Sequence, residues 1–177
     1  MSENRDIQNI EIEREQQFLC IVSCLLSFGT NYENNVKSIV ELSHRLLGTA
    51  CVTYSRYEKG TLRTVAAKRD CSLSASHECA NSICDKLEDD LSEDSFPIQP
   101  AAECTKQCLV HRIRCEHETK AVLCLCHGGE GGPVWGGNTL LGMLISACQA
   151  EERRYDSYLA LQDSEERFKA ICESCCV

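Results

Sequence analysis

The chain has 177 residues, of which 43% are hydrophobic and 25% charged, so it fits one ordinary globular domain with flanking helices rather than a disordered chain. Its net charge of -9 excludes a general nucleic-acid-binding protein, which needs a basic face to displace counterions from phosphates. No apolar run approaches the roughly 20 residues that span a bilayer. The acidic start, MSENRDIQNIEIEREQQ, is unlike a secretory signal, so we expect a cytoplasmic protein.

The chain contains 15 cysteines, which is unusually many. At this density a small secreted protein would be held together by disulfides, but the count is odd, the start is not an export signal, and the chain is long enough for a core of its own. The composition therefore predicts reduced thiols, most of them serving as small buried hydrophobic side chains.

The first predicted element is a helix from Ser2 to Phe28, because apolar residues recur three and four positions apart until Gly29, which we expect to end it. The nearly heptad spacing leaves two interpretations open. The helix either packs on its own domain or forms the entry helix of a dimer. A second helix is expected from Asn31 to Leu47, with Gly48 ending it.

The apolar period then changes from helical to alternating. The segments CVTYSRY at 51–57 and TLRTVAAKR at 61–69 alternate around the turn EKG, which predicts a β-hairpin. Ser82 can cap a short helix, ICDKLEDDL. Two prolines in SFPIQPA, at 95–101, indicate an extended segment at the edge of a sheet.

The stretch CLVHRIRCEHETKAVLCLCH holds four cysteines and three histidines, which raises the question of a metal site. Side chains alternate between the faces of a strand, so Cys124 and Cys126 share a face. His111 and Cys115 share a face too, whereas Cys108 lies on the other one. Neither strand offers the tight C-x2-C turn that zinc sites usually use. We interpret the stretch as a second hairpin whose cysteines pack a pair of central strands.

A long last helix is expected after the glycine-rich segment HGGEGGPVWGGN, with Asn138 as its cap. The glycine-rich segment is not a phosphate-binding loop, because no Gly-Lys-Ser/Thr follows it. Heptad spacing within the helix relates Leu140, Leu144, Ala147, Tyr158, Leu161 and Phe168. The order of elements predicts an α+β fold, with an antiparallel sheet, helices packed on one face, and long terminal helices.

Residues 36–69, VKSIVELSHRLLGTACVTYSRYEKGTLRTVAAKR, resemble the opening of a GAF domain, the ligand-binding sensory module of signalling proteins. The likeness lies in a helix that ends in LLG, the strand after it, and the GTL that begins the next strand. KAVLCLCH at 120–127 resembles the GAF strand that usually reads IGVLCL, and Trp135 stands where GAF domains carry a tryptophan before their exit helix. The resemblance implies a GAF-like domain at about 16–155.

A second, shorter segment, DSEERFKAI at 163–171, resembles the entry to a PAS domain of sensor proteins. Residues 1–15 are then expected to begin an entry helix, and 156–177 to form an exit helix that leads into a PAS-like start. The chain also departs from some GAF patterns, since Cys115 stands where the family usually has Pro. The bilin-attachment patterns are absent, as is the G-H-I-A-C stretch of GAF-type methionine sulfoxide reductases.

In GAF domains the ligand pocket lies between the sheet and the segments that join the two strand groups, here about 70–110. The resemblance therefore implies a set of candidate ligand- or cofactor-binding residues, namely His77, Cys79, Cys84, Cys104, Cys108 and His111. Such residues could bind a heme iron, ligate an iron–sulfur cluster or respond to oxidation, or they could line an apolar pocket that holds no cofactor. The sequence leaves the cofactor unspecified and nominates no catalytic residue and no separate metal site.

The resemblance implies a sensory or regulatory module of a signal-transduction protein, with a sensor histidine kinase as the expected parent. Such a module would bind a small molecule and pass a signal through helices of a homodimer. One alternative is a redox, metal or heme sensor of the same fold. Another is a thiol-dependent sulfoxide reductase.

Overall fold

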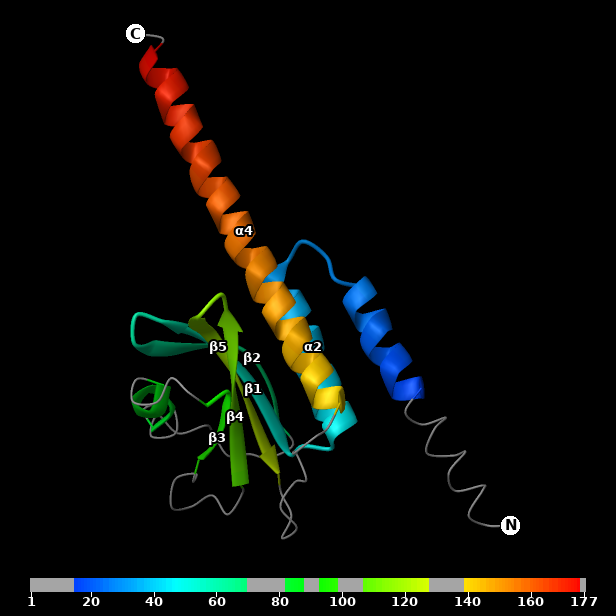
Figure 1. Ribbon diagram of the computed structural model, residues 1–177. Coiled ribbons are helices and arrows are strands. Elements are labelled where there is room, and N and C mark those ends of the chain that lie inside the picture. The colour runs from blue at the N-terminus through cyan, green and yellow to red at the C-terminus, as the bar shows by residue number, and fades with distance from the viewer. Residues whose placement is uncertain (1–14, 70–81, 88–92, 99–106, 128–138, 176–177) are drawn as a thin grey trace, which may run out of the picture.

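A computed structural model of the chain describes residues 15–69, 82–87, 93–98, 107–127 and 139–175 (Figure 1). Its centre is a five-stranded antiparallel sheet in the order β2-β1-β5-β4-β3. The strands are β1 (Cys51–Glu58), β2 (Thr61–Arg69), β3 (Ser95–Ile98), β4 (Gln107–Cys115) and β5 (Glu118–His127). Both predicted hairpins are confirmed, and so is the antiparallel α+β architecture.

The hairpins close through tight turns. In the first, Lys59 and Gly60 both have positive φ, at 52° and 76°, as a two-residue turn of the type that matches strand twist requires. In the second, Glu116 has φ of 56°. Among the described strands β3 pairs with β4 alone, so Pro97 lies on an edge strand of this sheet, where a missing N–H donor is tolerated.

Helix α2 (Tyr32–Leu47) ends before Gly48 as expected, and Asn31, expected as its first residue, is its N-terminal cap instead. The side chain of Asn31 accepts a hydrogen bond from the amide of Asn34 at 2.9 Å, and Gly48 adopts the left-handed conformation with φ of 60°. The buried side of the helix carries Val36 and Ile39, which are almost fully buried. This side faces the sheet.

Helix α4 (Thr139–Cys175) is 37 residues long and lies with α2 against one face of the sheet, which we call the helix face (Figure 1). Its first half is buried at Leu141, Leu144 and Cys148. Its second half continues beyond the sheet (Figure 1), where Leu161 and Phe168 are exposed. The long C-terminal helix is thus confirmed, and one helix joins the domain core to a projecting segment.

The N-terminal helix covers residues 15–26 within the described part of the chain; residues 1–14 of the expected helix lie outside it. Its Ile21 is 1% exposed and belongs to the core of the helix face. Gly29 does not end this helix. Its amide donates to Oδ1 of Asn35 at 3.0 Å, and Nδ2 of Asn35 donates to its carbonyl at 2.9 Å, which fixes the link between the two helices.

A short helix at residues 82–87 lies on the other side of the sheet, packed with β3. Ser82 is the first described residue within this helix rather than a residue before it. Residues 88–91 of the predicted short helix, and Asn138, fall outside the described residues. None of the described helices is long and apolar enough to cross a membrane.

Candidate functional site

The sheet face opposite α2 and α4, which we call the far face, carries a group of cysteines. The pairing register identifies its residues, because directly paired residues on neighbouring strands point to the same side. Val110 and Val122 pack there against the short helix and β3, whereas Ile113, Leu123 and Leu125 pack on the helix face. The far face also holds Cys51, Thr53, Cys108, Arg112, Cys124 and Cys126.

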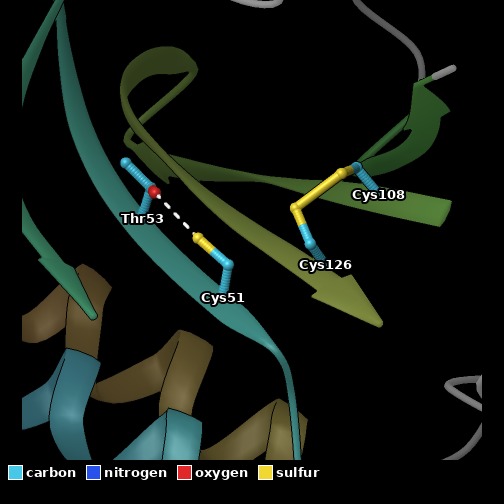
Figure 2. Close-up of a disulfide and its surroundings, with 4 residues drawn as sticks. All are labelled: Cys51, Thr53, Cys108 and Cys126. Carbon is cyan, nitrogen blue, oxygen red and sulfur yellow. Dashed lines mark hydrogen bonds between the residues drawn. A yellow bond between two sulfur atoms is a disulfide. The ribbon is translucent and has the colours of Figure 1, made fainter. Parts of the chain in front are cut away.

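Three of these cysteines form one row across three neighbouring strands. Cys51 of β1 is paired directly with Cys126 of β5, and Cys126 is paired directly with Cys108 of β4. Cys108 and Cys126 form a disulfide, with their Cα atoms 4.3 Å apart (Figure 2). All three residues are partly exposed.

The disulfide differs from the expectation that the cysteines are reduced and act as packing groups. The reason is the register of β4 and β5, which places these two residues opposite each other at a separation that suits a disulfide. On the helix face the expectation holds better. Cys148 is buried, and burial raises the pKa of its thiol, so it stays protonated and packs as a small hydrophobic group.

The short helix is held on the far face by Arg112. The guanidinium of Arg112 donates to the carbonyl of Lys86 at 2.9 Å and lies 5.2 Å from the centre of the Phe96 ring. Ile83 and Leu87 of the helix are buried in the same cluster as Phe96. The short helix and β3 therefore cover part of the far face with the apolar side chains of Ile83, Leu87 and Phe96.

The predicted site residues are dispersed. Cys108 lies in the cysteine row of the far face, and Cys84 lies on the short helix and is partly exposed. His111 lies on the helix face, because it pairs with Leu123, and the sheet separates it from Cys108. His111 is 8% exposed, and burial lowers the pKa of its imidazole, opposed by the nearby Asp94.

The other three predicted residues, His77, Cys79 and Cys104, fall outside the described residues. Within the described ranges no three His, Cys, Asp or Glu side chains are grouped so that they could hold a metal ion. Sequence reasoning did not select Cys51 or Cys126 as site residues. The alternation within each strand placed Cys126 on a face, but only the register between strands brings it beside Cys51 and Cys108.

A second feature that the sequence did not indicate is a buried polar network on the helix face, centred on Glu152 of α4. Glu152 is fully buried and accepts hydrogen bonds from the phenols of Tyr32 and of Tyr54, the latter at 2.7 Å. Its other carboxylate oxygen lies 3.2 Å from Nε of Arg56 on β1. A single carboxylate thus ties together α2, β1 and α4.

Arg56 extends this network toward the projecting half of α4. Its guanidinium lies 3.4 Å from the carboxylate of Asp156 and 4.8 Å from the centre of the Tyr155 ring. Lys120 of β5 lies 3.5 Å from the same Asp156 carboxylate. Two strands of the sheet therefore hold α4 just before the helix leaves the domain.

The two tyrosines of the network are kept neutral. Burial, together with the neighbouring Glu152, raises the pKa of Tyr32 far above its ordinary value. Burial likewise raises the pKa of Tyr54, and the neighbouring Glu152 carboxylate adds to the effect. Both phenols therefore remain hydrogen-bond donors to Glu152 across the physiological range of pH.

A neighbouring carboxylate, Glu151, attaches the other side of α4 to the start of α2. It is 2% exposed at its side chain, accepts a hydrogen bond from Nδ2 of Asn35 at 2.9 Å, and pairs with Arg154. Asn35 also forms two hydrogen bonds with the backbone of Gly29. Its amide side chain therefore connects the link between the first two helices to Glu151 of α4.

Comparison with solved structures identifies the fold. The GAF domain assigned to a sensor histidine kinase of Pseudomonas syringae pv. tomato superposes with a TM-score of 0.65 at 12% identity, covering 89% of this chain and 99% of that one. The GAF domain of an Acinetobacter phosphoenolpyruvate-protein phosphotransferase gives 0.58 at 10% identity, over 84% and 95%. A methyl-accepting chemotaxis protein, residues 122 to 287, gives 0.56 at 14% identity, over 80% and 98%.

By sequence alone, no family model and no curated protein matches the chain. The structural likeness is therefore one of fold, and it agrees with the resemblance seen in residues 36–69 and 120–127. The chain adopts the fold of a GAF domain.

Proposed function

We propose that the chain is a sensory module of a signal-transduction protein, in which an event at the far face biases α4 within a homodimer. The observation that carries the proposal is that α4 is one continuous helix. Its first half is built into the core through Leu144 and Glu152, and its second half projects (Figure 1). Further support comes from the similar structures, which include a GAF domain assigned to a sensor histidine kinase and residues 122 to 287 of a methyl-accepting chemotaxis protein.

The connection between the two faces runs through β1. Successive residues of a strand point to opposite sides, so Ser55 lies toward the far face and Arg56 toward the helix face. Arg56 contacts both Glu152 and Asp156 of α4. A change in the position of β1 would therefore act directly on the root of the projecting helix, and a ligand that binds one position of β1 more tightly would favour the matching position of α4.

The projecting half of α4 carries the apolar side chains that a parallel dimer would cover. Leu161 is 59% exposed and Phe168 is 69% exposed, and they are seven residues apart, which is one heptad. The N-terminal helix has a similar exposed set, including Phe18 at 48% and Leu26 at 82%. We propose that the partner is a second copy of this chain, since both terminal helices expose apolar residues on the same molecule.

The dimer is tested by measuring the molar mass of the protein in solution by light scattering after gel filtration. We expect the wild-type chain to be a dimer and Phe168→Glu to shift it toward the monomer, because a charge in a buried seam is strongly unfavourable. Ala170→Glu is the matched control, since position 170 is about 200° around the helix from Phe168. A wild-type monomer, or equal behaviour of the two variants, contradicts the proposal.

The ligand is tested on protein purified without oxygen, by its absorption spectrum and its metal content. A Soret band, or the absorption of an iron–sulfur cluster, would show that the protein binds a cofactor. The predicted cysteines and histidines at 77–111 would then be the candidates for its iron ligands. A colourless, metal-free protein would direct the search to small organic ligands. The expected parent, a sensor histidine kinase whose PAS-like start follows at 163–171, belongs to the same proposal.

A second candidate function is a thiol-based redox sensor of the same fold. The disulfide between Cys108 and Cys126 favours it, because this link joins two central strands on the face where the signal is proposed to begin. Reduction with a dithiol and oxidation with a peroxide should then shift the monomer–dimer equilibrium of wild-type protein. The same treatment should have no effect on the variant Cys108→Ser/Cys126→Ser.

A further inference from the structure

Cys126 has a cysteine directly opposite it on each of its two neighbouring strands. Cys108 of β4 is its disulfide partner, and Cys51 of β1 is its register partner on the other side. All three lie on the far face and are partly exposed. An alternative disulfide partner is therefore next to the existing bond.

The backbone geometry suits either pairing. In an antiparallel sheet the Cα atoms of directly opposed residues are about 4.5 Å apart in non-hydrogen-bonded pairs and about 5.5 Å apart in hydrogen-bonded pairs. Cys108 and Cys126, at 4.3 Å, form the closer kind. The carbonyl of Cys126 accepts a hydrogen bond from the amide of Ala50 at 2.9 Å, so it points toward β1, and a residue opposite it there, such as Cys51, belongs to the wider kind. Both spacings fall near those of natural disulfides, roughly 4.4–6.8 Å.

The thiol of Cys51 is available for the second pairing. Cys51 is not in a disulfide, and its sulfur lies 3.7 Å from Oγ1 of Thr53, two residues along the same strand (Figure 2). This contact is weak, and a rotation about χ1 would turn the sulfur from Thr53 toward β5. In the strand register Cys124 lies opposite Thr53 and Val110, so it is not directly opposed to Cys51 or to Cys108.

We propose that Cys51, Cys126 and Cys108 form a three-thiol exchange site, in which Cys126 is linked either to Cys108 or to Cys51. The Cys51 thiolate attacks the sulfur of Cys126, the new Cys51–Cys126 bond forms, and the Cys108–Cys126 bond breaks. The proton lost by Cys51 is replaced by one taken up on the released Cys108 thiolate, so the exchange needs no outside oxidant. A peroxide oxidises the reduced site, taking two electrons and two protons, and a dithiol reduces it again.

The exchange would move the covalent link from β4 to β1. Strand β1 is the one whose Arg56 contacts Glu152 and Asp156 at the root of α4. The two linked states thus differ in whether the strand that holds α4 is tied to the centre of the sheet. This inference rests on the redox version of the proposed function.

The test is peptide mapping by mass spectrometry after rapid alkylation of thiols. Trypsin places the three cysteines on separate peptides, 46–56 with Cys51, 107–112 with Cys108, and 121–153 with Cys126. Wild-type protein oxidised with hydrogen peroxide should give mainly 107–112 linked to 121–153. In Cys108→Ser and in Cys108→Ala, the main link should become 46–56 to 121–153.

The exchange step itself is tested on oxidised wild-type protein, freed of peroxide and held at mildly alkaline pH. A fraction linked through 46–56 should appear while Cys108 becomes open to alkylation. Cys51→Ala should abolish that fraction, and the matched control Cys124→Ser, on the same tryptic peptide as Cys126, should leave it unchanged.

The outcomes separate the two levels of the proposal. Cys51 could remain a free thiol, and so be alkylated, in folded Cys108→Ser and Cys108→Ala after peroxide treatment. If wild-type protein still forms its disulfide reversibly, the exchange site is wrong and the redox function stands. If wild-type protein does not form the Cys108–Cys126 bond with peroxide, both are wrong. Folding of the variants is checked by circular dichroism.

Discussion

The helix face and the far face of the sheet both hold polar or reactive groups, but they hold them in opposite ways. On the helix face the groups are charged and buried, and the carboxylate of Glu152 has two phenol donors and the Arg56 guanidinium around it. On the far face the groups are sulfurs, partly exposed, and joined by a bond that can open. The first arrangement fixes α4 to the domain; the second offers a place where a chemical event can occur.

The difference shows which face of the sheet can rearrange at a small cost in stability. Breaking one partner of a buried ion pair leaves a charge without compensation, so the helix face tolerates little rearrangement. The disulfide between Cys108 and Cys126 lies on the partly exposed far face, so it can open without burying a charge. The arrangement therefore separates a responsive face from a face that keeps the mechanical link to α4.

The largest expected effect comes from removing the centre of the buried network. Glu152→Ala should lower the free energy of unfolding by about 3–5 kcal/mol, because Arg56 and the two phenols lose their common partner. Urea unfolding followed by circular dichroism measures it. The control is Glu33→Ala, which removes an exposed ion pair with Arg63, at 3.9 Å, and should cost less than about 1 kcal/mol. Equal costs would show that the network does not stabilise the fold.

Opening the disulfide should have the next largest effect. The bond closes a loop with a sequence separation of 18, and a loop of this size contributes about 2–4 kcal/mol by restricting the unfolded chain. Reduction with dithiothreitol should lower the melting temperature of wild-type protein. The variant Cys108→Ser/Cys126→Ser should melt at that lower temperature with or without the reductant. A reductant effect that persists in this variant would locate it at other cysteines.

A smaller effect is expected in alkali, from the tyrosines of the network. Burial and Glu152 raise the pKa of Tyr32 above its ordinary value of 10.0, so the folded state keeps the phenol protonated where the unfolded state ionises it. The stability that this provides is complete below pH 10 and is lost as pH rises further.

The measurement is unfolding free energy against pH. Tyr32→Phe should be less stable at neutral pH by about 1.5–3 kcal/mol, the usual contribution of a hydrogen bond to a charged group. It should also lose less stability above pH 10 than wild-type protein does. Tyr158→Phe is the control, since Tyr158 is 58% exposed on the projecting half of α4. The same alkaline slope in Tyr32→Phe and wild type would contradict the assignment.

The sequence predicts local elements of this fold well and their mutual placement poorly. Gly48 and the turn around Gly60 carry local signals for a helix end and a hairpin turn, and both predictions are confirmed. The pairing of Cys108 with Cys126 depends on the register of two strands, which is set by a tight turn and a bulge after Ile113. Alternation within one strand contains no information about that register.

The buried network is hidden from sequence for a related reason. Glu152 stands in a run of charged residues, EERRYD, which reads as a solvated part of an exposed helix. Its burial depends on Arg56, roughly a hundred positions earlier, and on Tyr32 and Tyr54. Only the packing of α4 across β1 brings these residues together. Of the predicted site residues, Cys108 lies in the cysteine row and His111 does not, because neighbouring strand positions of odd and even parity face opposite ways.

The smallest effect is expected in acid, at His111. Burial lowers the pKa of this imidazole below its ordinary value of 6.5, and Asp94 only partly opposes the shift, so the folded state favours the neutral ring. The stability it provides is complete above pH 6.5 and is lost as pH falls, because the unfolded chain binds the proton more readily. His111→Gln should therefore flatten the stability profile below pH 6.5, measured by urea unfolding at a series of pH values. His117→Gln, in the exposed turn of the second hairpin, should leave that profile as it is. If both variants keep the wild-type slope, the acid sensitivity arises elsewhere, and His111 is buried on the helix face without influence on the folding equilibrium.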